Sequence, residues 1–113
     1  MAASKTVTTL VEAIHDALGG FAPEKLCPDV EDFLSGMPEV WEAMSEQVKK
    51  VASRMEDGMP VHAEVPDALR ELIPHLDRLA EASREANEIF RRKHEEDLKR
   101  YHEPRNNEPA ANV

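Results

Sequence analysis

A heptad-spaced apolar pattern near the carboxyl end constrains this chain more than any other feature. Apolar or small residues recur there at alternating steps of three and four: Leu69, Leu72, Leu76, Leu79, Ser83, Ala86 and Phe90. This spacing keeps one face of an α-helix continuously apolar, and it predicts a helix from Pro66 to about His102. Such a helix would be roughly 55 Å long, too long for the rest of a small chain to surround. Another helix must therefore cover its apolar face.

A second pattern of the same kind lies earlier in the chain, at Met37, Trp41, Met44, Val48, Val51 and Met55. Pro38 suits the first turn of a helix and Gly58 suits its end, so we expect a helix over residues 38–57. The short connection to Pro66 makes the two helices antiparallel neighbours. The two patterns predict an antiparallel helical hairpin with these anchors in its interface: Trp41, Met44, Val48, Leu76, Leu79 and Phe90.

Three further elements complete the expected fold. Residues 6–18 predict an N-terminal helix, with Gly19–Gly20 as its left-handed stop. Pro23, Pro28 and Gly36 interrupt the next stretch, where Asp29 is expected to cap a short connecting helix. Pro74 predicts either a kink in the long helix or a short helix before it and the main helix after it. The expected fold is an all-α small helical bundle over residues 1–103, followed by a disordered tail at 104–113.

Composition makes several classes of protein less favoured. The chain has 14 basic and 23 acidic residues and a formal charge of −9, which disfavours direct binding to nucleic acid without excluding it. Its one cysteine, Cys27, cannot form an intrachain disulfide and fits a reducing compartment. The N-terminus does not resemble a secretory signal, and no apolar run approaches the length of a membrane span. We therefore expect a cytoplasmic protein with no membrane contact.

No residue pattern points to catalysis. The chain has no Glu-x-x-His pair of the kind that di-iron helical bundles use, so no metal site is expected. It also lacks a Gly-x-Ser-x-Gly motif and a phosphate-binding glycine loop. We expect no enzyme activity, no cofactor and no small-molecule substrate.

The end of the long helix carries the candidate contact surface. Charged residues dominate after Phe90, with pairs such as Arg91/Glu95 and Arg92/Glu96 four residues apart, so we expect this segment to be solvent-exposed on most sides. The predicted partner-binding residues are Phe90, Arg91, Arg92, His94, Leu98 and Tyr101. They predict a non-enzymatic interaction or assembly module that binds a protein partner or forms a homodimer through the long arm of the hairpin.

An alternative function uses the same segment. Basic residues concentrate toward the C-terminal end, so the chain could instead be a small regulator or accessory factor of a nucleic-acid transaction such as transcription. The stretch Phe90-Arg91-Arg92-Lys93-His94-Glu95-Glu96-Asp97, continuing through Arg100 to Pro104-Arg105, resembles the C-terminal end of small uncharacterised all-helical actinobacterial proteins. Some of those proteins are found with plasmid-transfer or mobile-element genes. The resemblance implies a genetic context and no catalytic residue.

Overall fold

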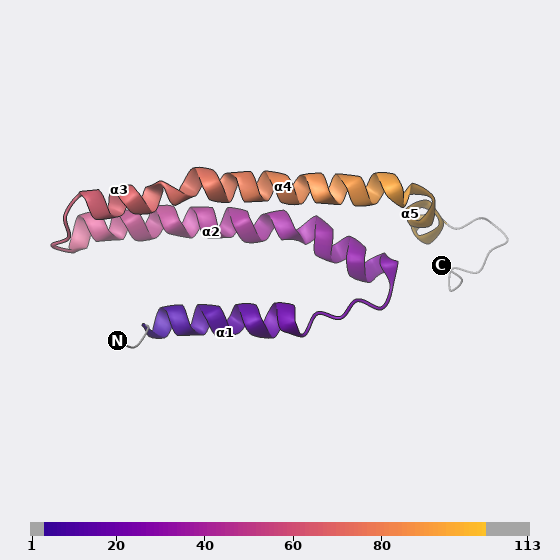
Figure 1. Cartoon of the computed structure of the whole chain (residues 1–113), viewed down its shortest axis with the longest axis horizontal. Helices are drawn as coiled ribbons and strands as arrows, with labels where there is room; N and C mark the ends of the chain where they lie inside the picture. The colour runs from indigo at the N-terminus through magenta and orange to yellow at the C-terminus, as the bar shows by residue number, and fades with distance from the viewer. Residues whose placement is uncertain (1–3, 104–113) are drawn as a thin grey trace.

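The structure, a computed structural model, describes residues 4–103 as an all-α chain without strands in that range. The molecule is elongated, with extents of 68 × 26 × 18 Å. Figure 1 shows α2 and α4 running antiparallel along the long axis, with α1 beside α2 and α5 turned across the far end. In chain order the elements are α1 (Lys5–Gly19), the turn η1 (Leu26–Val30), α2 (Glu31–Gly58), α3 (Glu64–Arg70), α4 (Leu72–Lys93) and α5 (Glu95–His102). The predicted all-α fold with a long helix pair is confirmed.

The helix α2 begins earlier than the sequence predicted. It runs without a break through Gly36 and Pro38, so the separate short helix expected before residue 38 is wrong. Pro38 removes one backbone hydrogen bond, but its ring is buried and α2 bends in its first part instead of ending (Figure 1). Burial of this segment on the rest of the hairpin outweighs the loss of one bond.

The connection before α2 is held by Asp29 in an unexpected way. Asp29 does not cap the following helix; its Oδ2 accepts hydrogen bonds from the backbone N–H groups of Glu24 and Lys25, at 3.0 and 3.1 Å. These two donors stabilise the carboxylate and lower the pKa of Asp29 below its ordinary value.

The predicted left-handed stop of α1 is also wrong, because Gly20 has a φ of −88°.

The interface between α2 and α4 is built from small residues. The most buried positions of α2 include Pro38, Ser45 and Ala52, at intervals of seven, while Ala80 is 2% exposed on α4. This hairpin seam is shifted by one residue from parts of the predicted patterns, since Ser45 replaces Met44 and Ala80 replaces Leu79. Small side chains let the two helices approach closely and move the larger neighbours to the flank of the pair.

Polar contacts fix the register of the hairpin. The Ser45 hydroxyl donates a hydrogen bond of 3.0 Å to Oδ1 of Asp77. Nearer the closed end, Arg70 donates from both Nη atoms to the carboxylate of Glu56, with Nη1 2.8 Å from Oε2. This pair lowers the pKa of Glu56, because the guanidinium favours the ionised carboxylate.

The long C-terminal helix is divided at two places. The helix α3 ends at Arg70 and α4 begins at Leu72, which confirms the alternative of a short helix followed by the main helix. Pro74 lies in the first turn of α4, where its missing N–H leaves no intrahelical bond unmade. A second break at His94, with φ −118° and ψ 28°, makes the predicted unbroken helix to His102 wrong.

Candidate functional site

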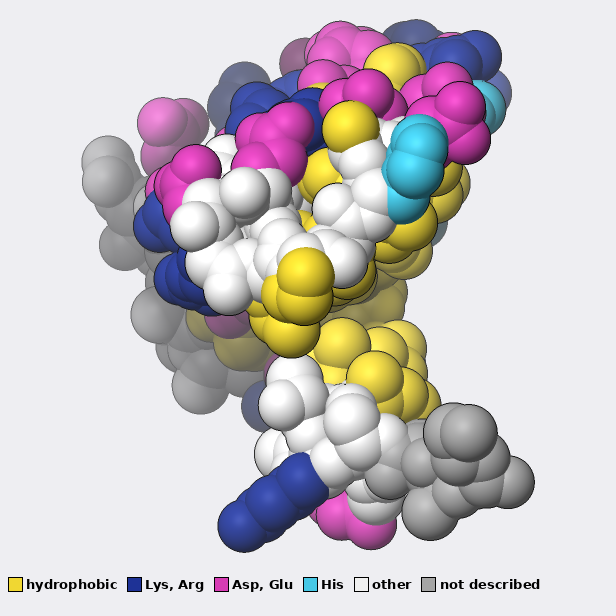
Figure 2. All heavy atoms as spheres, turned by 90° about the vertical axis from the view of Figure 1, so that its left-hand side faces the viewer, with side chains coloured by type: hydrophobic (Ala, Val, Ile, Leu, Met, Phe, Trp, Pro, Cys, Tyr) yellow, Lys and Arg dark blue, Asp and Glu magenta, His cyan; other side chains and the backbone are white. Residues whose placement is uncertain are grey.

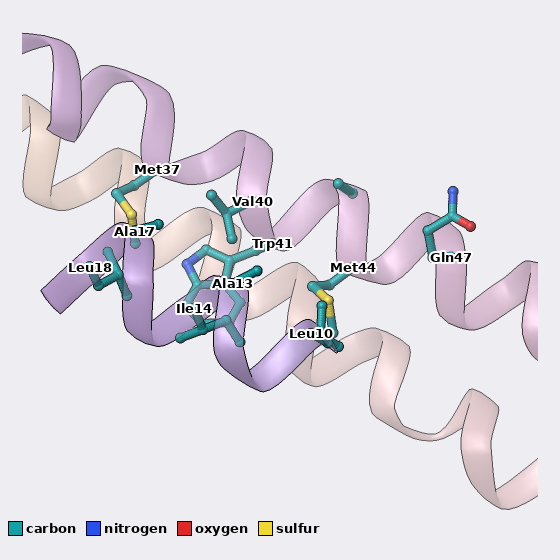
Figure 3. Close-up of a pocket in the computed structure, with 11 residues that line it drawn as sticks. Leu10, Ala13, Ile14, Ala17, Leu18, Met37, Val40, Trp41, Met44 and Gln47 are labelled. Atoms are coloured by element: carbon teal, nitrogen blue, oxygen red, sulfur yellow. The ribbon is translucent and has the colours of Figure 1, made fainter. Parts of the chain in front are cut away.

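An apolar groove lies between α1 and α2 in the described part of the chain. It has a volume of about 490 Å³. From α1 it is lined by Leu10, Ala13, Ile14, Ala17 and Leu18, and from α2 by Met37, Val40, Trp41, Ala43, Met44 and Gln47. Figure 3 shows Trp41 reaching from α2 toward Ala13 and Ile14 of α1. Only Gln47 contributes a polar side chain, so the groove suits an apolar ligand surface.

The helix α1 forms one wall of this groove without being packed into a core. Its fold is ordinary, since Ser4 caps it by accepting a 3.1 Å hydrogen bond from the Val7 N–H and its apolar residues share one side. Yet every residue from 4 to 20 is exposed, and Ile14 and Leu18 retain 50% and 52% of their accessible surface. Figure 2 shows hydrophobic side chains gathered at the waist between this lower helix and the hairpin. The apolar face of α1 is therefore only partly covered within the chain.

The apolar surface continues from the groove onto the flank of α4. On α2, Met44 and Val51 come directly before the seam residues Ser45 and Ala52. On α4, Leu79 comes directly before the seam residue Ala80, and Leu72 lies seven residues before Leu79. In an antiparallel pair, the same one-residue step rotates both sets to the same side of the hairpin. That side is the one on which α1 lies, because Met44 lines the groove. Leu72 and Leu79 are 47% and 43% exposed there.

Acidic residues predominate on the two helices that form the groove. Together α1 and α2 carry nine acidic and four basic residues, whereas α4 is close to neutral with four acidic and five basic residues. The walls of the groove are thus apolar and the polar faces of α1 and α2 are net negative. On α2, Glu42 and Glu56 pair with Arg84 and Arg70 of the same chain, so the net charge of the two helices does not by itself make the groove acidic.

Two of the predicted partner-binding residues are buried in contacts within the chain. Phe90 and Leu98 are 8% and 7% exposed and form a buried cluster with Cys27. The cluster also contains partly buried side chains from η1, α2 and α5, which are Leu26, Val30, Leu34 and Tyr101. The expectation that the segment after Phe90 is exposed on most sides is therefore wrong where α5 turns back onto η1. These apolar side chains hold α5 in place.

Arg91, a third predicted partner-binding residue, contacts Glu31 of its own chain. This carboxylate is 6% exposed and lies 2.8 Å from Nε2 of His102 and 3.4 Å from Nη2 of Arg91. Arg91 therefore contacts an acidic group of its own chain. A buried carboxylate needs such partners, so this cluster supports the docking of α5 beside α2.

The remaining predicted residues lie at the surface of the same end. Arg92 is exposed, and the partly exposed ring of His94 lies 5.2 Å from the Phe90 ring while its Nδ1 is 3.2 Å from Oδ2 of Asp97. Tyr101 is partly buried and its ring meets that of His102 edge-on at 4.9 Å. The structure thus brings the six predicted residues to one end of the molecule, far along the long axis from the N-terminal part of α1 (Figure 1).

The lone cysteine lies within that end cluster. Burial raises the pKa of the Cys27 thiol, and the negative charges of Glu31 and Asp97 raise it further. The thiol is therefore protonated at neutral pH and poorly suited to nucleophilic chemistry.

Residues 4–103 contain neither a candidate metal site nor a helix that could span a membrane. No group of three or more histidine, cysteine or acidic side chains in that range is placed to hold a metal ion. None of the helices in the same range combines the length and the apolar character needed to cross a bilayer.

Sequence reasoning assigned the groove residues to an ordinary core. Trp41 and Met44 were predicted as hairpin anchors, and residues 6–18 only as an N-terminal helix. The available signal was that α1, α2 and α4 each present an apolar stripe wider than one helix pair can bury. Comparison with known proteins finds no matching family model, no matching curated protein and no matching solved structure. The resemblance of residues 90–105 to actinobacterial proteins stays a prediction.

Proposed function

We propose that this protein is a non-enzymatic interaction module that binds another polypeptide through the groove between α1 and α2. One observation carries the proposal, namely a groove lined by apolar side chains apart from Gln47, whose outer wall, α1, has no buried side chain. An apolar surface of this extent on a small chain is a frequent mark of a protein-binding site. Trp41 at its centre is the residue type that most often dominates the energy of such interfaces.

The groove, and not the end of the long arm, is the contact surface that we propose. Phe90 and Leu98 supply the cluster that docks α5, so a partner that used them would first have to open the chain. The groove needs no such opening, because four of its residues, Leu10, Ile14, Leu18 and Val40, are already about half exposed. Self-association through Phe90 and Leu98 therefore has less support than binding at the groove.

The alternative of a nucleic-acid regulator gains no support from the arrangement of the basic end. Arg91 lies against buried Glu31, and Arg84 of the same helix contacts Glu42 and Glu81. A phosphate-binding surface requires basic side chains that can face the backbone of the nucleic acid.

Site-specific photo-crosslinking tests the proposal. A photoreactive phenylalanine analogue at Val40 reports on the groove, and the same analogue at exposed Ser53 of α2 is the matched control outside it. We expect a discrete polypeptide adduct from position 40 in cells that produce the protein, and none from position 53. Equal labelling from both positions, or none from position 40, would contradict the proposal.

A further inference from the structure

We infer that this protein pairs with a second copy of itself, with α4 of one chain lying antiparallel against α4 of the other. The contact surface, which we call the outer face of α4, consists of Leu72, His75, Leu79, Ala82, Ala86 and Ile89. It includes neither Phe90 nor Leu98, which are buried inside the chain. It also lies outside the groove between α1 and α2, so the inference goes beyond the proposed function and does not depend on it.

The outer face of α4 has the residue spacing of a coiled coil. Its residues follow one another at steps of three, four, three, four and three, so they form one continuous stripe along the helix. The seam with α2 uses another side of α4, where Ala80 is the buried residue. The helix α4 therefore carries a second heptad stripe that α2 does not cover.

Every residue of the outer face is exposed to solvent. Leu72, Leu79 and Ile89 retain 47%, 43% and 45% of their accessible surface. Figure 1 shows α4 along one edge of the molecule, with α2 beside it and α1 beyond α2. A row of large apolar side chains on one side of a long helix is the surface that a second helix covers in a coiled coil.

The charged residues beside the outer face are left unpaired by the described chain. Four of them follow one edge of the face at intervals of seven and alternate in sign, namely Glu71, Arg78, Glu85 and Arg92. All four are exposed, and none of them forms an ion pair within residues 4–103. Arg84 and Arg91 of the same helix, by contrast, pair with Glu42 and Glu31.

A two-fold antiparallel pairing fits the side-chain sizes of the outer face. We place Leu79 opposite Ala82 of the second copy. In the same register His75 lies opposite Ala86, and Leu72 lies opposite Ile89 at each end of the contact. Small residues at the centre let the two helices approach closely, and the larger pairs close the ends.

This register also pairs the four edge charges. Arg78 lies opposite Glu85 of the second copy, and Glu71 lies opposite Arg92. The two residues of each pair differ in height along the helix axis by two positions, which is roughly 3 Å. Side chains lean toward the N-terminus of their own helix, so in an antiparallel pair these two side chains lean toward each other. The two-fold axis repeats both pairs, and four ion pairs between the chains result.

Other arrangements bring like charges together or leave the charges without partners. Sliding the second helix by one heptad in one direction sets Arg78 against Arg78 of the second copy, and the opposite slide sets Glu85 against Glu85. In a parallel pair the edge charges would lie beside the uncharged residues Leu76 and Ser83. The formal charge of −9 opposes association in general, but the four edge residues sum to zero. The edge charges therefore select one orientation and one register.

The predicted dimer is weak, because the contact involves one helix face of each chain. Interfaces of this kind lie at the small end of the specific ones, so we expect a dissociation constant of roughly 100 µM. Sedimentation equilibrium of the full chain, from low-micromolar to millimolar concentration, measures it. A chain that stays monomeric at millimolar concentration overturns the inference.

Two single charge reversals test the surface and the register together. Arg78→Glu places acidic groups opposite each other, and Glu85→Arg places basic groups opposite each other. Each variant alone should dimerise about 10-fold more weakly than the parent chain. An equimolar mixture of the two variants should dimerise as strongly as the parent, because each acidic group then faces a basic one. Lys49→Glu, at an exposed position of α2, is the matched charge control and should change the dissociation constant by no more than about 2-fold.

Circular dichroism must show that each variant keeps the helix content of the parent chain. If Arg78→Glu or Glu85→Arg loses helix, Arg92→Glu and Glu71→Arg replace them, since those residues form the other predicted pair. A dimer that both reversals leave intact would place the contact on another surface and overturn the inference. A mixture that stays as weak as its two components would overturn the antiparallel register.

Discussion

Ser45 of α2 and Asp77 of α4 are joined by a hydrogen bond of 3.0 Å at the middle of the hairpin. This contact sets which residues face the partner helix. With Ser45 in the seam, Ala52 and Ala80 also lie there, and Met44 and Leu79 are turned toward the flank. The close pairing of small residues and the apolar surface beside it are thus two consequences of one register.

Enlarging a seam residue should disturb the hairpin. Ala80 is 2% exposed, and Ala80→Leu should lower the free energy of unfolding by about 1–3 kcal/mol because the added side chain has no space. Ala82→Leu, two residues further along α4 at an exposed position, is the matched control and should change the stability by no more than about 0.5 kcal/mol. Urea unfolding followed by circular dichroism measures both. Equal effects would mean that Ala80 does not face α2.

Removing a buried polar atom should stabilise the same interface. Among the described residues, the Oδ1 atom of Asn87 is buried without a hydrogen-bond partner. Asn87→Leu should raise the free energy of unfolding by about 1 kcal/mol, since an unsatisfied carbonyl is costly to bury. Asn87→Asp should lower it, because a charge replaces a dipole at that position. A loss of stability in Asn87→Leu would show that the amide has a partner in solution.

The thiol of Cys27 should be protected in the native state. Burial raises its pKa, so the thiolate fraction at pH 8 is smaller than that of a free thiol. We expect alkylation by iodoacetamide to be at least 100-fold slower in the folded chain than in urea. Leu98→Ala should accelerate alkylation by loosening α5, and Leu72→Ala, outside the end cluster, should not. Rapid alkylation of the parent chain would contradict the observed packing.

Acid should remove the contribution of Asp29. Its folded pKa is lowered by the N–H groups of Glu24 and Lys25, so the ionised form stabilises the fold above the unfolded pKa of about 4. This contribution is lost as the pH falls through the lower folded value. Asp29→Asn should therefore lower the melting temperature at pH 7, and the difference from the parent chain should disappear under strongly acidic conditions. A difference that is independent of pH would assign the effect to shape and not to charge.

The sequence predicted the helices better than their contacts. Heptad spacing identified the hairpin, because the apolar periodicity of both helices is strong. The heptad pattern placed Met44 and Leu79 in the interface, whereas the structure has their neighbours Ser45 and Ala80 there. Hydrophobicity alone ranks the larger residue of each pair as the core residue. Close approach of helices instead favours small residues, which only the assembled pair reveals.

The conformation of residues 91–102 also depends on tertiary contacts. The charged sequence after Phe90 predicted an exposed helix, and Leu98 was predicted to bind a partner. In the structure the helix breaks at His94, which lets Leu98 reach Cys27 and Phe90. No local signal in residues 90–102 identifies Cys27, which is more than sixty positions earlier, as its neighbour.

Amide hydrogen exchange tests the central claim most directly, because it compares the two candidate contact surfaces in one experiment. In the free chain, residues 5–19 should exchange faster than residues 38–55, since α1 has no buried side chain. With the polypeptide captured by crosslinking from position 40 bound at saturation, exchange in α1 should slow at least 10-fold, and exchange over residues 95–102 should stay the same. Protection confined to residues 90–102, with α1 unaffected, would contradict the assignment of the groove as the contact surface.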